Sequence, residues 1–164
     1  MSRSTHLLSY AFTPEKVKEC VKSLKNELEH RIEQYQALSI EQLQAPQAWP
    51  GLHYIIFVDD YELVTTPDPR SGNPLNPLEG LLQSAHEIGF HIVLARRIVN
   101  FGQTTMDPIF RGIKNMESPG LLMRGDPVEG RLVLHKQSIS DTLLTGRGSL
   151  VRRGYPPTLV QVAM

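Results

Sequence analysis

The first strong pattern in the chain is a helical repeat of apolar residues that starts after residue 13. Thr13, Pro14 and Glu15 have the order of an N-cap, a proline at the first helical position and an acid in the first turn. Apolar side chains then recur every three or four residues, at Val17, Cys20, Val21, Leu24, Leu28 and Ile32. The spacing predicts a long amphipathic helix. Its other face, which includes Arg31, mixes both signs of charge, and we expect it to be solvated surface without chemistry.

An unbroken apolar run of strand formers follows at residues 54–58, and a second run, which begins with His91, lies at residues 91–95. The first is apolar on both faces, which is typical of a strand in a parallel sheet that is covered on both sides, and we expect the second to be an interior strand too. Between them, a proline-rich loop at 65–77 leads into a predicted helix over residues 76–88, closed by Gly89. A capping-box pair, Ser39 and Gln42, predicts a further short helix at 39–43.

The second half of the chain continues this alternation and then changes. Asp107 and Pro108 predict the start of another helix, and residues 121–123 predict a strand. The order strand, helix, strand, helix, strand is typical of right-handed parallel crossovers, so we expect an α/β domain with a mostly parallel sheet and flanking helices. Residues 148–153 and 158–162 flank a Gly-Tyr-Pro-Pro turn and predict a terminal antiparallel hairpin.

Composition narrows the classes of function. The chain has 164 residues, 40% of them hydrophobic and 21% charged, which fits one compact globular domain. Its 17 basic residues balance its 17 acidic ones, so no overall basic field exists to gather nucleic acid or an anionic membrane. The single Cys20 lies in the helical pattern, and we read it as a small apolar residue in a reducing compartment. No apolar run approaches the length of a membrane span, so we expect that this chain does not itself span a membrane.

The strongest candidate chemistry is the acid pair Asp59 and Asp60, at the carboxyl end of the first apolar run. Open α/β sheets bind ligands at this edge, and paired carboxylates there suit Mg²⁺ or a water bound to it, as in a Walker B segment. The alternative is that the acids only end the strand and begin a turn. Arg96 and Arg97 follow the second run, where they could pair with a phosphate or with the two carboxylates.

Three further observations bear on a ligand site. Glycines at Gly146 and Gly148, around Arg147, would let a ligand approach the backbone closely, although such segments are also ordinary turns. The six histidines show no metal-ligand spacing on a common element, so we expect no histidine metal site. No window matches the Walker A pattern Gly-x-x-x-x-Gly-Lys-Ser/Thr, so a complete phosphate-binding loop cannot be drawn.

Taken in order, these segments resemble the FtsK/SpoIIIE-type ATPases, and within them the EccC component of type VII (ESX) secretion systems. The order and spacing of the similar segments match this family from about Leu7 to the end of the chain. The similar segments are Val58-Asp59-Asp60-Tyr61, Asn73-Pro74-Leu75, residues 85–91, Ala95-Arg96-Arg97, residues 118–123 and Gly146-Arg147-Gly148.

The resemblance implies that residues 1–164 are a single partial RecA-like P-loop NTPase domain, the carboxyl-terminal part of one EccC ATPase module without its Walker A half. Asp59 and Asp60 then match the Walker B acids, with Asp59 as the Mg²⁺ ligand and Asp60 where a water-activating acid stands. Arg97 matches an arginine of the translocases, whereas Arg96 replaces a glutamine that senses the γ-phosphate, which counts against efficient hydrolysis. The segment from Gly146 to Gly148 matches a loop near the nucleotide.

The resemblance also implies cofactors, partners and a location. The cofactor is ATP with Mg²⁺, and the partners are other EccC modules or subunits and WXG-type ESX substrate dimers. The location is the cytoplasm, with the inner face of the membrane reached through the secretion complex. The alternatives are an ATPase half completed in trans by a chain that bears Walker A, and a fragment of an FtsK-type DNA translocase, against which the neutral charge counts. A receiver-like signalling domain is disfavoured because Arg96, Arg97 and Arg124 stand where it needs an Asp and a Lys.

Overall fold

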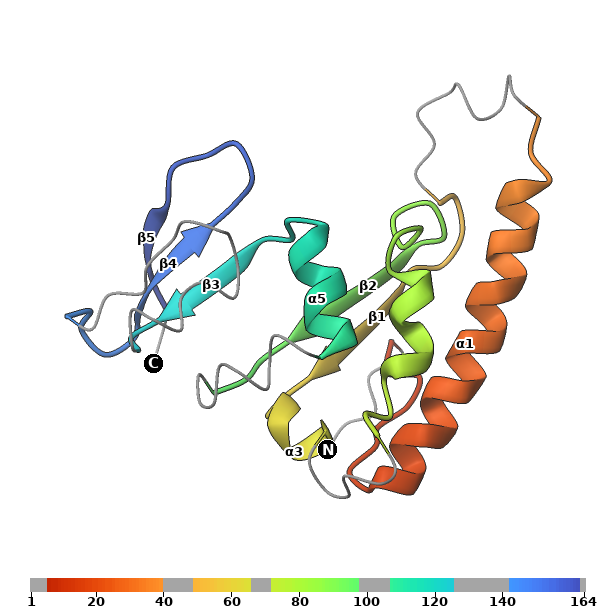
Figure 1. Cartoon of the computed structure of the whole chain (residues 1–164), viewed down its shortest axis with the longest axis horizontal. Helices are drawn as coiled ribbons and strands as arrows, with labels where there is room; N and C mark the ends of the chain where they lie inside the picture. Colours follow the sequence, from red (N-terminus) through yellow and green to blue (C-terminus); the bar gives the residue numbers. More distant parts are fainter. Residues whose placement is uncertain (1–5, 40–48, 66–71, 98–106, 126–141, 163–164) are drawn as a thin grey trace. The chain divides into compact units, whose positions relative to one another are not determined.

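The computed structural model describes residues 6–39, 49–65, 72–97, 107–125 and 142–162, and it divides into two compact units at residues 96 and 97 (Figure 1). The first unit holds α1 (Pro14–Gln36), β1 (Tyr54–Val58), α3 (Tyr61–Thr65), the 3-10 helix η1 (Asn76–Leu81) and β2 (Phe90–Leu94). The second holds α5 (Pro108–Asn115), β3 (Gly120–Met123), β4 (Arg147–Val151) and β5 (Thr158–Gln161). The single-domain organisation stays a prediction.

Helix α1 begins as the sequence predicts. The side chain of Thr13 accepts a hydrogen bond from the backbone N–H of Lys16 at 3.3 Å, and Pro14 occupies the first turn. Val21 and Leu28 are buried, which confirms the apolar face. The prediction for Arg31 is wrong, because this side chain is only 5% exposed.

Strands β1 and β2 form a parallel pair whose two faces differ. The register runs from Tyr54 opposite Phe90 to Val58 opposite Leu94. Burial alternates along both strands, with Val58 and Phe90 buried on one face. Helices α1 and η1 lie side by side (Figure 1), and α1 reaches this face where Arg31 meets the ring of Tyr54. The side chains on the other face of the pair are exposed, and the expectation that the sheet is covered on both sides stays a prediction.

The segment predicted as one helix over 76–88 is instead the short η1 followed by turns up to Gly89. Leu78 and Leu81, both buried, are three residues apart, which matches the three-residue turn of a 3-10 helix. Gly80 lies between them and weakens an α-helix. Gly89 does end the segment, with a positive φ of 64°. The predicted short helix at 39–43 lies outside the described residues except for Ser39.

The second unit contains a three-stranded antiparallel sheet in the order β3-β4-β5. Its β4–β5 part confirms the predicted terminal hairpin. Strand β3 does not continue the parallel alternation, since it pairs antiparallel with β4 from Gly120 opposite Val151 to Met123 opposite Gly148. Leu121 is exposed and Leu122 buried, the alternation of a sheet with one wet face.

Helix α5 starts at the predicted place, because the carboxylate of Asp107 accepts hydrogen bonds from the N–H groups of Ile109 and Phe110. In the part of the chain that the structure describes, no helix combines the length and the apolar character needed to cross a membrane.

Candidate functional site

The acid pair forms a tight turn directly after β1. Asp59 is exposed, and its Oδ1 accepts a hydrogen bond from the backbone N–H of Asp60 at 3.0 Å. Asp60 has a φ of 45°, in the left-handed region that non-glycine residues seldom occupy. Helix α3 begins at the next residue. Aspartate tolerates this region in turns, and such conformations also occur at functional sites, so the conformation fits both interpretations of the acid pair.

The residue after the acids anchors the turn. The backbone N–H of Tyr61 donates to the carbonyl of Ala95 at 2.9 Å, and the N–H of Ala95 donates to the carbonyl of Val58 at 2.8 Å. The ring of Tyr61 is buried, and its hydroxyl accepts from Nδ2 of Asn73 at 2.6 Å. Oδ1 of Asn73 accepts from the N–H of Leu75 at 2.9 Å. The turn is therefore tied both to the end of β2 and to the segment before η1.

Sequence reasoning missed the bond between Tyr61 and Asn73. It singled out both residues only as parts of similar segments, without connecting them. The available signal was Asn73 before Pro74, since an Asn at such a place can bond the backbone two residues on and present its amide group to a neighbour. Asn73 thereby helps to hold the tight turn formed by Asp59 and Asp60, which we call the acid turn.

Arg96 lies where the sequence predicts. It follows Ala95 directly, so its backbone stands at the same edge of the parallel pair as Asp59 and Asp60. Arg97 begins the second unit. The structure thus groups one of the two arginines with the acids within a single unit.

The segment from Gly146 to Gly148 opens β4 in the second unit. Gly146 has a φ of 75°, and its carbonyl accepts from the N–H of Val162 at 2.7 Å. Nε of Arg147 donates to Oε1 of Gln161 at 3.2 Å. A Cβ at Gly148 would stand 2.8 Å from side-chain atoms of Leu121 and Met123. Close packing against β3 therefore accounts for Gly148, and a ligand role for the segment stays a prediction.

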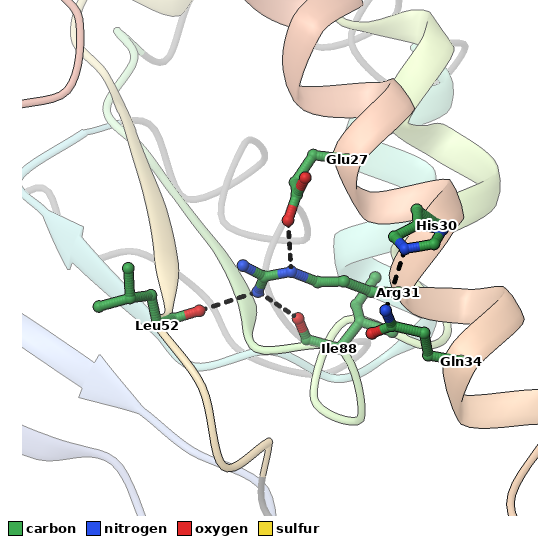
Figure 2. A network of polar contacts seen from close by, with 6 residues as sticks. All are labelled: Glu27, His30, Arg31, Gln34, Leu52 and Ile88. Atoms are coloured by element: carbon green, nitrogen blue, oxygen red, sulfur yellow. Dashed lines mark hydrogen bonds and ion pairs between the residues drawn. The ribbon is translucent and has the colours of Figure 1, made fainter.

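A second polar cluster lies at the opposite, amino ends of β1 and β2 (Figure 2). Nη1 of Arg31 donates to the carbonyls of Leu52 and Ile88 at 2.8 and 2.9 Å, and its Nε donates to Glu27 at 3.3 Å. The guanidinium also lies 4.7 Å from the ring centroid of Trp49 and 4.4 Å from that of Tyr54. The two carbonyls belong to the segments that lead into the strands, so Arg31 fixes where both strands begin.

The position of Arg31 in the helical pattern indicates that it is buried, although arginine as a residue type suggests exposure. Arg31 follows Leu28 by three residues and Leu24 by seven, which places it on the buried face of α1. Arginine is generally exposed, but it is tolerated in the interior when its donors find partners, as those of Nε and Nη1 do here.

The structure also pairs two histidines from different elements. Nδ1 of His53 lies 2.8 Å from Nε2 of His91, one before β1 and the other in β2. A search for spacing on one element could not find this pair. Among the described residues, no group of three or more His, Cys, Asp or Glu side chains is placed to hold a metal ion.

The parallel strand pair with its helices and the antiparallel sheet fit an α/β fold of the P-loop NTPase type, and solved structures support this fold class. The cytoplasmic domain of the Thermomonospora curvata type VII secretion ATPase EccC matches with a TM-score of 0.82 at 36% identity, over 98% of this chain and 18% of that chain. Another solved chain, described as an ATPase, has the same fold, with a TM-score of 0.72 at 24% identity over 94% of this chain and 54% of its own.

Curated relatives show the same similarity. The ESX secretion system protein EccC of Thermomonospora curvata is 36% identical over 163 residues, and the ESX-4 secretion system protein EccC4 of Mycobacterium tuberculosis is 34% identical over 160. No family model matches the chain. The chain is homologous, over almost its whole length, to one segment of the EccC ATPases of type VII (ESX) secretion systems, which confirms the resemblance. It spans 12% of the length of these two relatives.

Proposed function

We propose that this chain forms the acid-bearing part of one ATPase module of a type VII secretion motor, and that its acid turn takes part in binding Mg²⁺ and ATP. One observation carries the proposal. Asp59 and Asp60 occupy a strained turn at the carboxyl end of a parallel strand pair, in a chain homologous to EccC. Ligands of open α/β sheets bind at this edge.

The residues present fit Mg²⁺ and a nucleotide. Mg²⁺ prefers oxygen ligands, and Asp59 offers an exposed carboxylate oriented by the N–H of Asp60. In the proposal, Asp59 holds the metal ion and Asp60 orients a water molecule. Arg96 pairs with phosphate oxygens. For Arg97 and for Gly146, Arg147 and Gly148, which belong to the second unit, a role at the nucleotide remains what the resemblance implies. Bound Mg²⁺ would neutralise part of the charge of the phosphates.

Hydrolysis of ATP would need a further polypeptide segment that holds the phosphates. The sequence has no Walker A pattern, whose backbone amides and lysine hold the phosphates in P-loop enzymes. We therefore assign the chain little hydrolysis by itself and place the phosphate loop on a Walker A-bearing polypeptide, in the same or another chain. Within a secretion complex, the partners would be other EccC modules and WXG-type substrate dimers, on the cytoplasmic side of the membrane.

The test is calorimetric titration of Mg²⁺-ATP into this chain together with the Walker A-bearing segment of Thermomonospora curvata EccC. The double variant Asp59→Ala, Asp60→Ala should weaken binding at least about tenfold, since a phosphate-bound metal ion loses its protein ligand. Glu29→Gln, which changes an exposed carboxylate on α1, is the matched control and should bind as the wild type does. Equal binding by the wild type and the double variant would contradict the proposal.

A further inference from the structure

Two side chains connect the acid turn to the segment that leads into η1. Nδ2 of Asn73 donates to the hydroxyl of Tyr61 at 2.6 Å, and Oδ1 of Asn73 accepts from the backbone N–H of Leu75 at 2.9 Å. Tyr61 follows Asp60 directly, and its side chain is almost fully buried. A residue twelve positions further along the chain therefore bonds the neighbour of the acids.

Asn73 belongs to a well-packed part of the first unit. Leu75 and Leu78, which follow it, are buried, and η1 lies beside α1. The carbonyl of Asn73 accepts from the N–H of Asn76 at 3.1 Å, and the carbonyl of Leu75 accepts from the N–H of Leu78 at 2.9 Å. Asn73 is thus fixed by its own backbone bonds and by the packing around it, and these contacts do not involve the acids.

The acid turn is a short bridge between two held residues. The backbone of Val58, before the acids, and that of Tyr61, after them, both bond to Ala95. Between them Asp60 has a φ of 45°, a conformation that persists in a residue with a Cβ only where the surroundings enforce it. In this conformation the N–H of Asp60 donates to Oδ1 of Asp59 at 3.0 Å. Whatever holds Tyr61 therefore also holds the carboxylate of Asp59.

We propose that Asn73 is a positioning residue for Mg²⁺, because its hydrogen bond to Tyr61 keeps the acid turn in the conformation that orients the carboxylate of Asp59. This inference rests on the proposed function. Mg²⁺ demands near-ideal octahedral geometry, so a ligand that rotates away from its direction binds the ion less well. Residues that orient a metal ligand by hydrogen bonds strengthen metal binding without touching the metal ion.

A positioning role and a purely structural role predict different results. If Asn73 only stabilises the fold, its loss lowers the fraction of folded chain but leaves the affinity of each folded molecule unchanged, with and without Mg²⁺. If Asn73 orients Asp59, its loss lowers the affinity for ATP chiefly when Mg²⁺ is present. The informative quantity is therefore the gain in ATP affinity that Mg²⁺ provides.

The experiment measures this gain by calorimetry, for this chain together with the Walker A-bearing segment of Thermomonospora curvata EccC. Asn73→Ala and Tyr61→Phe should each reduce the gain at least about threefold, which is within the effect of one hydrogen bond. The double variant should reduce it no further than Asn73→Ala does, since both changes remove the same bond. Tyr61→Phe keeps the buried ring and remains informative if Asn73→Ala does not fold.

Ile88→Val is the matched control for stability. Ile88 is buried near the amino end of β2, whereas the acids lie at the carboxyl end of the strand pair. Removing one methyl group there should lower Tm by a few degrees, and it leaves the bond between Asn73 and Tyr61 in place. The gain from Mg²⁺ should equal that of the wild type, and circular dichroism should show every variant folded.

Three results would overturn the inference, and they separate it from the proposed function. A gain that Asn73→Ala and Tyr61→Phe leave unchanged, in a wild type that shows the gain, would exclude a positioning role and leave the proposed function intact. An equal reduction in Ile88→Val would assign the effect to stability. A wild type without any gain from Mg²⁺ would contradict the proposed function itself, and the inference with it.

Discussion

At the scale of single residues, Arg31 makes the clearest energetic contribution. Its guanidinium is buried between two aromatic rings and donates to two backbone carbonyls that enter different strands. Arg31→Ala leaves both carbonyls without this donor and opens space beside Trp49, so we expect a loss of about 3 kcal/mol in the free energy of unfolding. Urea denaturation measures the loss.

Two controls separate the charge of Arg31 from its shape. Arg31→Lys keeps the charge but lacks the planar fork, and we expect it to lose about 2 kcal/mol. Lys25→Ala removes one partner of an exposed ion pair with Glu29 on the same helix and should change stability by less than about 1 kcal/mol. An Arg31→Ala variant as stable as Lys25→Ala would show that the cluster does not hold the strands.

Asp60 combines a strained backbone with a candidate chemical role, and two substitutions distinguish the contributions. Asp60→Gly should be more stable than Asp60→Ala by about 1 kcal/mol, because glycine adopts a φ of 45° without steric cost. Both variants lack the carboxylate, so both should weaken Mg²⁺-ATP binding equally. Thermal unfolding and calorimetry on the same samples provide the two readouts. If the two variants were equally stable, Asp60 would not be strained.

At the scale of elements, Gly89 decides how the chain enters β2. It has a φ of 64°, and a Cβ there would lie 2.6 Å from Cδ1 of Trp49. Gly89→Ala therefore meets both backbone strain and a clash, and we expect a loss of about 2 kcal/mol. Gly80→Ala in η1 is the control, since nothing lies within 4 Å of a Cβ there and alanine restricts the unfolded chain. It should be neutral or stabilising in the same denaturation assay.

The elements also show which parts of the fold could be predicted from the sequence. Helix α1, the two parallel strands and the terminal hairpin depend on local patterns and capping residues, and these predictions are confirmed. The partner of β3 depends on a contact with residues far along the chain, where Gly148 admits the side chains of Leu121 and Met123. An alternation of strands and helices contains no information on that contact, which is why the parallel placement was wrong.

The candidate site, too, could be predicted from the sequence only in part. Asp59 and Asp60 are adjacent and follow a recognisable strand, so their place at the sheet edge could be predicted. The hydrogen bond from Asn73 to Tyr61 and the burial of Arg31 result from packing between segments, and no single pattern along the chain specifies them. The assembly of Arg97 and the segment from Gly146 to Gly148 with the acids remains a prediction of the resemblance.

At the scale of the whole molecule, the exposed apolar side chains of Ile55, Phe57 and Val93 on β1 and β2 predict how the isolated chain behaves. Exposed apolar surface on a sheet promotes association. We expect association that increases with protein concentration and decreases in Phe57→Asp, whose wild-type side chain is 75% exposed. Size-exclusion chromatography with light scattering tests this expectation. A wild-type chain that stays a monodisperse monomer at high concentration would contradict it.

The central claim is that the acid turn holds Mg²⁺ on a bound nucleotide. The most direct measurement is ATP affinity with and without Mg²⁺, for wild type and Asp59→Ala, each together with the Walker A-bearing EccC segment. We predict that Mg²⁺ strengthens binding at least about tenfold in the wild type and has little effect in Asp59→Ala, because the carboxylate is the ligand lost. An equal gain from Mg²⁺ in both proteins would show that the metal ion is held elsewhere and would contradict the account.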